Sequence, residues 1–258
     1  MKKLFVFLLI ILLCLAFVLP SFAKGERCQG WFIKRRGNLR PEFPSEASEL
    51  EKLGVYFIDE KYPDKREEKK LYLTFDAGYE NGNVEKILDV LKNEGVPGAF
   101  FLLDNIIIKN PELIKRMEKE GHLVCNHTKR HRNLSSAKDD EIIADLTALE
   151  VLYKEKTGRE MDKYFRFPEG KYSESALKCI KNMGYKTMFW SFGYEDWDNN
   201  RQPSCDYAIK KILSNTHNGA IILLHPNSST NAKILPELIS AWRKMGYEFG
   251  TLRDFDNI

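Results

Sequence analysis

The amino-acid sequence predicts an α/β fold with about seven parallel strands and helices outside them. Three observations indicate it: apolar segments of strand length recur, helix-like segments lie between them, and glycines follow several of the helix-like segments. The chain has 258 residues, 43% hydrophobic and 30% charged, which suffices for one large domain with a packed core. This composition excludes a disordered polar chain and a protein with many membrane spans.

From residue 71 onward, seven short apolar segments have the length of buried strands. Because helix-like segments separate them, parallel pairing with right-handed crossovers is favoured, and the helices then lie outside the sheet. The expected strands cover residues 71–75, 98–103, 122–125, 164–167, 186–190, 220–224 and 247–252.

Apolar residues three and four positions apart predict the helices between these strands. Gly95, Gly121 and Gly158 follow three of them, as expected for helix ends. A closed barrel and an open doubly wound sheet both fit this alternation, and periodicity does not choose between them. The expected helices include residues 84–91, 113–117, 142–152, 176–183, 207–213 and 235–245.

The first 23 residues predict an export signal. Lys2 and Lys3 precede an unbroken apolar run over 4–19, and Ser21 and Ala23 are small residues of the kind that signal peptidase accepts. We expect cleavage after Ala23 and a protein of the cell envelope or the exterior. An uncleaved membrane anchor is the alternative, although the run is shorter than the about 20 residues that span a bilayer.

Residues 24–66 differ in composition from the rest of the chain and predict an N-terminal extension packed on a main domain over 67–258. Its basic cluster at 34–36 is expected to be a solvated face, with contact to an anionic wall polymer as the alternative. The formal charge is only +3, so the chain shows no electrostatic case for binding nucleic acid. The cysteines beyond the signal lack C-x-x-C spacing and are expected to be buried free thiols: Cys28, Cys125, Cys179 and Cys205.

Polar side chains lie at the ends of five predicted strands. Because the carboxyl ends of parallel strands meet at one edge, where α/β domains place their active sites, these side chains are expected to converge. They are Asp76, His127, His131, Arg166, Asp196 and His225.

Each of these residues has a structural and a functional interpretation. On a helical turn, His127 and His131 would face one way and suit one metal ion, although this spacing alone is weak. Asp76 is either a turn acceptor or a general base. Arg166 is either a surface ion pair or a bidentate partner that keeps Asp76 ionised.

His225 either caps its strand or acts as a general acid that protonates a leaving amine. Asp196 would raise the pKa of His225 and set its tautomer. His122 and His217 have no such context and are expected to be structural or surface residues.

Five short motifs follow one another in the order found in a known family. They cover residues 74–78, 127–131, 166–170, 196–197 and 223–225. The chain resembles the polysaccharide deacetylases, which are carbohydrate esterases with a distorted β/α barrel. The resemblance therefore implies this barrel and a hydrolase that removes acetyl groups from a glycan.

The resemblance also implies roles for single residues. It implies that Asp76 is the catalytic base, that Arg166 tethers it, and that Asp196 tunes His225, the acid. His127 and His131 are implied as ligands of a divalent metal, with zinc the expected ion. Trp197 and Leu223 are implied as walls of the pocket for the acetyl methyl group.

Two positions depart from the pattern of the family. Ala77 stands where the family commonly has an aspartate that ligates the metal, and Gly193 stands where the fourth motif commonly has an aspartate. Because a methyl group cannot coordinate a metal, we expect weaker metal binding. A backbone N–H near Tyr79 is a candidate donor to the oxyanion of the reaction.

The stretch 74–82 and the triplet 30–32 resemble, more narrowly, the delta-lactam-biosynthetic de-N-acetylases of spore-forming bacteria. This resemblance implies deacetylation of N-acetylmuramic acid in peptidoglycan strands, a step toward the muramic delta-lactam of spore cortex, with no protein partner. The alternatives are a deacetylase of an N-acetylglucosamine polymer or of xylan, and a non-catalytic glycan-binding pseudoenzyme suggested by Ala77. The chain lacks G-x-S-x-G, which disfavours a serine hydrolase.

Overall fold

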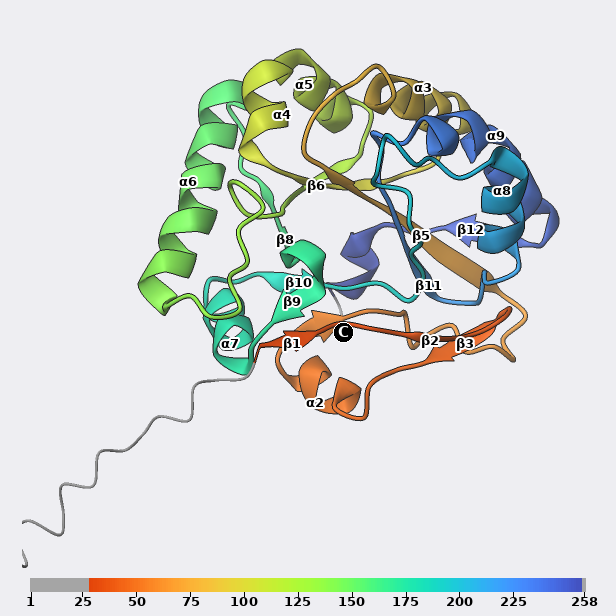
Figure 1. The fold of residues 1–258 in the computed structure, drawn as a ribbon, viewed down its shortest axis with the longest axis horizontal. Helices are drawn as coiled ribbons and strands as arrows, with labels where there is room; N and C mark the ends of the chain where they lie inside the picture. Colours follow the sequence, from red (N-terminus) through yellow and green to blue (C-terminus); the bar gives the residue numbers. More distant parts are fainter. Residues whose placement is uncertain (1–27, 257–258) are drawn as a thin grey trace, which may run out of the picture.

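The computed structural model describes residues 28–256, and within them eight parallel strands form one sheet that curls into an incomplete barrel (Figure 1). The predicted α/β barrel is confirmed, and so are all seven predicted strands. The strands of the sheet are β4 (Val55–Tyr56), β5 (Lys69–Ala77), β6 (Ala99–Leu102), β7 (Leu123–Asn126), β8 (Asp162–Phe165), β10 (Lys186–Met188), β11 (Ala220–Leu224) and β12 (Tyr247–Phe249).

The helices lie around the outside of the barrel (Figure 1). Gly95 and Gly158 adopt the left-handed conformation and end α3 and α6, as the sequence predicts. Short helix α4 was not predicted. The helices are α2 (Ala47–Lys52), α3 (Val84–Glu94), α4 (Asp104–Lys109), α5 (Pro111–Lys119), α6 (Asp139–Thr157), α7 (Glu174–Asn182), α8 (Cys205–Leu213) and α9 (Ser229–Lys244), with single turns η1 (Pro168–Gly170) and η2 (Leu252–Phe255).

The order of the strands is β11-β5-β6-β7-β8-β10-β4, and β12 pairs with the first residues of β5. Two isolated bridges bring the ends of this path together, Ile58 to Ala220 and Phe192 to Ile222. The barrel is therefore distorted where β4 and β10 approach β11, because no continuous ladder closes it there.

The alternation of side chains along β5 decides which residues reach the barrel interior. Its odd-numbered residues, from Leu71 to Ala77, pack beneath α3 and α9. Tyr72 packs with inward-facing residues of the other strands, and Thr74 and Asp76 continue the same face toward the carboxyl end of the strand. At the opposite end, Phe255 of η2 fills the barrel.

The N-terminal segment contributes to the barrel as well as covering it. Its strand β4 pairs with β10 and forms the edge of the sheet, and β1 (Gln29–Gly30) pairs with β9 (Lys171–Tyr172). Strands β2 (Lys34–Arg36) and β3 (Leu39–Glu42) form a hairpin beside it. Figure 1 shows this segment, in red and orange, along one side of the molecule. The division at residue 66 stays a prediction.

The prediction of four buried cysteines needs correction, and the predicted signal segment cannot be compared with the structure. Cys28 is an exposed thiol and Cys205 a half-buried one, whereas Cys125 and Cys179 are buried; all four are free. The predicted signal segment, residues 1–23, lies outside the described residues. None of the helices within 28–256 is long and apolar enough to cross a bilayer.

Candidate active site

A cleft of about 940 Å³ opens at the carboxyl ends of the strands, where the sequence places the site. Asp76, His127, His131 and His225 all line it, whereas Arg166 and Asp196 are fully buried behind it. The remaining lining residues are Gly78, Tyr79, Leu103, Asp104, Asn105, Arg130, Glu169, Trp190, Trp197, Leu223 and Asn227.

Arg166 fills the carboxyl end of the barrel interior and holds Asp76. Its Nη1 donates to Asp76 Oδ1 at 2.8 Å, and its Nη2 donates to Thr74 Oγ1 at 2.9 Å. Its Nε donates to the backbone oxygen of Met188 at 2.8 Å. The guanidinium also lies over the Phe101 ring, 4.2 Å from the centroid. Arg166 is 0% exposed, so its interpretation as a surface ion pair is wrong.

The charge of Asp76 is maintained by its surroundings. Burial by itself would raise the pKa of Asp76, but Arg166, His127 and His225 outweigh burial and lower it below the ordinary value. Arg166 occupies Oδ1, while Oδ2 lies 3.5 Å from His127 Nε2. Asp76 is therefore an ionised carboxylate with one oxygen on the side of His127.

The loop that carries His127 and His131 is not the helical turn that the sequence predicts. Thr128 and His131 have positive φ angles of 70° and 57°, a conformation that non-glycine residues seldom adopt. The loop is held by Thr128 N–H donating to Asn126 Oδ1 and Lys129 N–H donating to Asp145 Oδ1. The two imidazole rings nevertheless lie together, with centroids 5.1 Å apart.

The hydrogen bonding and the protonation state of His127 suit a metal ligand. Its Nδ1 donates to the backbone oxygen of Arg166 at 2.9 Å, which leaves Nε2 as the lone-pair nitrogen on the side of Asp76. Burial lowers the pKa of His127 to about 4, so the ring is neutral at pH 7.

Two imidazoles and a carboxylate oxygen are donor types that fit a divalent ion such as zinc. The number of donors falls short of a closed site, because residues 28–256 contain no group of three or more His, Cys, Asp or Glu side chains placed to hold a metal. The residues that would hold an ion are His127 and His131, with Asp76 Oδ2 beside them.

His225, which is partly exposed to the cleft, and the buried Asp196 form a second pair. His225 Nδ1 donates to Asp196 Oδ1 at 2.7 Å, and the backbone N–H of His225 donates to Asp196 Oδ2 at 2.9 Å. Burial lowers the pKa of His225, but Asp196 outweighs it and the pKa is raised. Because Nδ1 is occupied, Nε2 is the ring nitrogen left for a substrate.

Aromatic and apolar residues line the two sides of the cleft near His225. The Trp197 ring lies 5.9 Å from the His225 ring and is 54% exposed, and Leu223 is nearly buried. The hydroxyl of Tyr79 accepts hydrogen bonds from Asn199 Nδ2 and from Asn227 Nδ2. These residues supply ring faces suited to a sugar and a small apolar recess.

Comparisons with known proteins agree with this geometry. The family model for polysaccharide deacetylase matches residues 64–188. The peptidoglycan-N-acetylmuramic acid deacetylase PdaA of Bacillus subtilis is 40% identical over 225 residues, which are 87% of this chain and 84% of that protein. The chain belongs to the polysaccharide deacetylase family.

Further relatives and a solved structure extend the match. A peptidoglycan-N-acetylglucosamine deacetylase of Bacillus cereus is 30% identical over 196 residues, 72% of this chain and 88% of that one. The solved structure of B. subtilis PdaA, described as a family 4 carbohydrate esterase, superposes with a TM-score of 0.84 at 37% identity and covers 90% of this chain and 99% of its own. The fold is thus that of the polysaccharide deacetylases.

The structure also explains what the substitution at Ala77 changes. Ala77 follows Asp76 on β5, so its side chain points to the outer core, and it does not line the cleft. In this deacetylase the position adds no donor to the site. Gly193 lies behind the cleft wall, where Arg35 Nη2 donates to its backbone oxygen.

Sequence reasoning missed three residues of this polysaccharide deacetylase site. Thr74 accepts from Arg166 and donates to the Ile222 backbone oxygen at 2.7 Å, and its place on the inward face of β5 is the signal that reveals it. Trp190 lines the cleft. Asn231 lies on α9, six residues beyond the last motif, and donates to Asp196.

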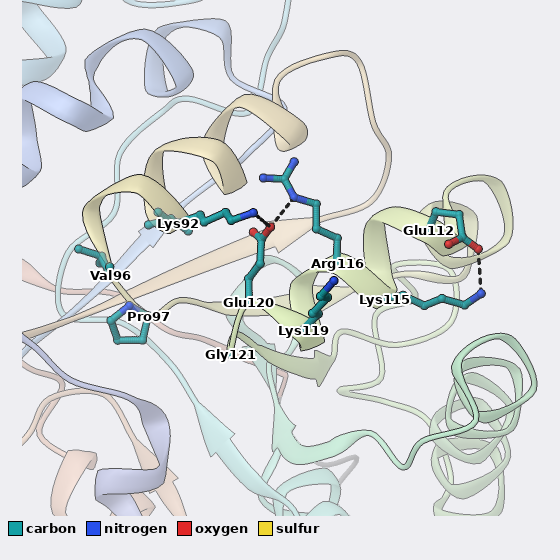
Figure 2. Close-up of a pocket in the computed structure, with 11 residues that line it drawn as sticks. Lys92, Val96, Pro97, Glu112, Lys115, Arg116, Lys119, Glu120 and Gly121 are labelled. Atoms are coloured by element: carbon teal, nitrogen blue, oxygen red, sulfur yellow. Dashed lines mark hydrogen bonds and ion pairs between the residues drawn. The ribbon is translucent and has the colours of Figure 1, made fainter.

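A second hollow, of about 720 Å³, lies between α3 and α5, away from these residues (Figure 2). Apart from Lys119, its charged residues pair with one another: Lys92 and Arg116 with Glu120, and Lys115 with Glu112. No residue of the deacetylase motifs lines it.

Proposed function

We propose that the chain is a hydrolase that removes the N-acetyl group from N-acetylmuramic acid residues of peptidoglycan. The observation that supports it most is the presence in one cleft of two charged pairs, Asp76 with Arg166 and His225 with Asp196. One pair keeps a base ionised and the other keeps an acid protonated, which is the arrangement that hydrolysis of an amide requires.

In this reaction a water molecule attacks the acetyl carbonyl carbon, and Asp76 accepts the proton that the water loses. The carbon–nitrogen bond then breaks, and His225 Nε2–H protonates the departing sugar nitrogen. Acetate and a free amine leave, and solvent returns the two residues to their starting protonation states. Arg166 keeps Asp76 oriented throughout, because its guanidinium is fixed by three other acceptors.

The surroundings of the carbonyl oxygen complete the site. A backbone N–H near Tyr79 is the proposed donor to the developing oxyanion. A divalent ion held by His127 and His131 would supply Lewis-acid polarisation of the carbonyl. Trp197 and Leu223 would enclose the acetyl methyl group.

The choice of muramic acid rests on relatives. The B. subtilis protein named for N-acetylmuramic acid is 40% identical, whereas the B. cereus protein named for N-acetylglucosamine is 30% identical. The leader-like sequence over 1–23 supports export to the envelope, where peptidoglycan lies. We extend the proposal to the muramic delta-lactam of spore cortex, made in the space between the forespore membranes.

Acetate release from defined glycans tests the proposal. The substrates are muramic glycan strands with and without stem peptides, and chitin oligomers, each assayed before and after chelation with metal content measured in parallel. We expect release from a muramic substrate, loss after chelation and recovery with zinc. Release from chitin oligomers alone would favour an N-acetylglucosamine deacetylase, and glycan binding without release would favour a pseudoenzyme.

A further inference from the structure

Asp196, the partner of His225, has both carboxylate oxygens engaged. Oδ1 accepts from His225 Nδ1, while Oδ2 accepts from the His225 backbone N–H and from Asn231 Nδ2 at 2.6 Å. Asp196 is 0% exposed, so no water competes for these positions. The donors to Oδ2 therefore fix the orientation of the carboxylate plane of Asp196.

Asn231 is itself fixed at its backbone. It lies in the first turn of α9, where Ser228 caps the helix and its Oγ accepts from the Asn231 backbone N–H at 3.1 Å. The side chain is buried, with 1% of its surface exposed. Asn231 thus reaches the Asp196 loop from a rigid element that packs beneath the cleft.

The amide of Asn231 has one orientation that satisfies all its neighbours. Nδ2 donates to Asp196 Oδ2 and to the His225 backbone oxygen at 3.1 Å, and Oδ1 accepts from the Tyr194 hydroxyl. A flipped amide would put its oxygen against the carboxylate and against a carbonyl. Burial raises the pKa of Tyr194, so the hydroxyl keeps its proton and remains a donor.

We infer that Asn231, oriented by Tyr194, is a positioning residue that holds Asp196 in the rotation that directs His225 Nε2 at the leaving nitrogen. The inference rests on the proposed deacetylase function for its catalytic consequence, but the contact itself is testable without activity. Asn231 does not line the cleft, and it acts through its hydrogen bonds to Asp196 and His225.

The test uses the nearly isosteric variant Asn231→Asp, which replaces the donor by an acceptor without changing volume. Asn218→Asp is the matched control, because Asn218 is also a buried amide, donating to the Pro63 and Glu68 backbone oxygens at the other end of β5. The proton resonance of His225 Nδ1–H is followed by NMR in the full chain and assigned by its absence in His225→Gln. Asn231→Ala provides a second variant if the aspartate does not fold.

We expect Asn231→Asp to shift or abolish the His225 resonance and to lower kcat by about 10- to 100-fold with KM nearly unchanged. Asn218→Asp should keep the resonance and kcat. A wild-type resonance and kcat in Asn231→Asp and Asn231→Ala, or an equal loss in Asn218→Asp, would overturn the inference. A wild-type protein that releases no acetate would overturn the proposed function, and the resonance alone would then decide the Asn231 contact.

Discussion

Asp76 and His225 face the same cleft, and their partners shift the two pKa values in opposite directions. Arg166 helps to lower the pKa of Asp76, and Asp196 raises the pKa of His225. Near neutral pH the first therefore stays a carboxylate, and the second more readily keeps its proton. Such divergence assigns Asp76 as base and His225 as acid.

Replacing either group should nearly abolish acetate release. We expect Asp76→Asn and His225→Ala each to lower kcat by about 10²- to 10⁴-fold, the usual contribution of a general base or acid. Asp76→Asn should also destabilise the fold, since it leaves the Arg166 charge buried without a counter-charge. Acetate release is measured well below the melting temperature of each variant. Turnover near the wild-type rate in a folded variant would refute the role of that residue.

The pH profile tests the Asp196–His225 pair. The acid form of His225 is lost as pH rises through its pKa, so kcat should fall on the alkaline side. Asp196→Asn removes the main group that raises the pKa of His225 against burial, so this alkaline limb should move to lower pH. Glu195→Gln removes the same charge at the neighbouring exposed position and should leave the limb in place. An unmoved limb in Asp196→Asn would contradict the pairing.

At the scale of elements, the N-terminal segment supports one wall of the cleft. Trp31 Nε1 donates to the backbone oxygen of Trp190 at 2.8 Å, and its ring stacks on Phe189 with centroids 4.9 Å apart. Arg35 contributes a further bond to Gly193. Strand β10 and the residues after it are thus held from outside by a segment more than 150 positions earlier.

Trp31→Ala should reduce both stability and substrate affinity. We expect a loss of about 3–5 kcal/mol in the free energy of unfolding, typical of a buried tryptophan, and a raised KM because Trp190 loses its support. Urea unfolding and steady-state kinetics measure the two effects. Trp242→Ala, on the buried face of α9, is the matched control and should destabilise without changing KM. If KM stays constant in Trp31→Ala, the segment stabilises the fold without shaping the cleft.

For the whole molecule, buried histidines outside the site link folding to pH. His122 accepts from the Gly98 backbone N–H through Nδ1, and its Nε2 has no partner among the described residues. His217 lies between the Asn215 backbone oxygen and the Ser191 hydroxyl. Burial lowers the pKa of each ring to about 4. Both are therefore neutral in the folded state.

Acid should destabilise the protein before its carboxylates titrate. Below pH about 6.5 the two histidines are protonated in the unfolded chain but stay neutral in the folded protein. The free energy of unfolding therefore decreases as pH falls from about 6.5 toward 4. Each histidine would contribute on the order of 3 kcal/mol. Urea unfolding between pH 7 and 4 measures the slope, and His122→Gln should make it shallower. An identical slope in that variant would exclude His122 as a contributor.

Local residue patterns were enough to predict seven strands of the sheet, the ends of α3 and α6, and the edge at which the site forms. These features are local: a strand in the sheet shows as an apolar run such as 220–224, and a helix end as a glycine such as Gly95. The polar groups Asp76 and His225 follow such runs directly, so their convergence was predictable from the geometry of parallel strands.

How these groups are held could not be predicted, because it depends on contacts between residues far apart in the chain. Arg166 lies one residue beyond β8, not within the strand as predicted, and its burial depends on its contacts with β5, β6 and β10. The short strand β4 has too few residues for a periodic signal. Asn231 contacts Asp196, although the two residues are 35 positions apart in the sequence. Such contacts follow from barrel closure and helix packing, which bring together residues whose spacing along the chain carries no pattern.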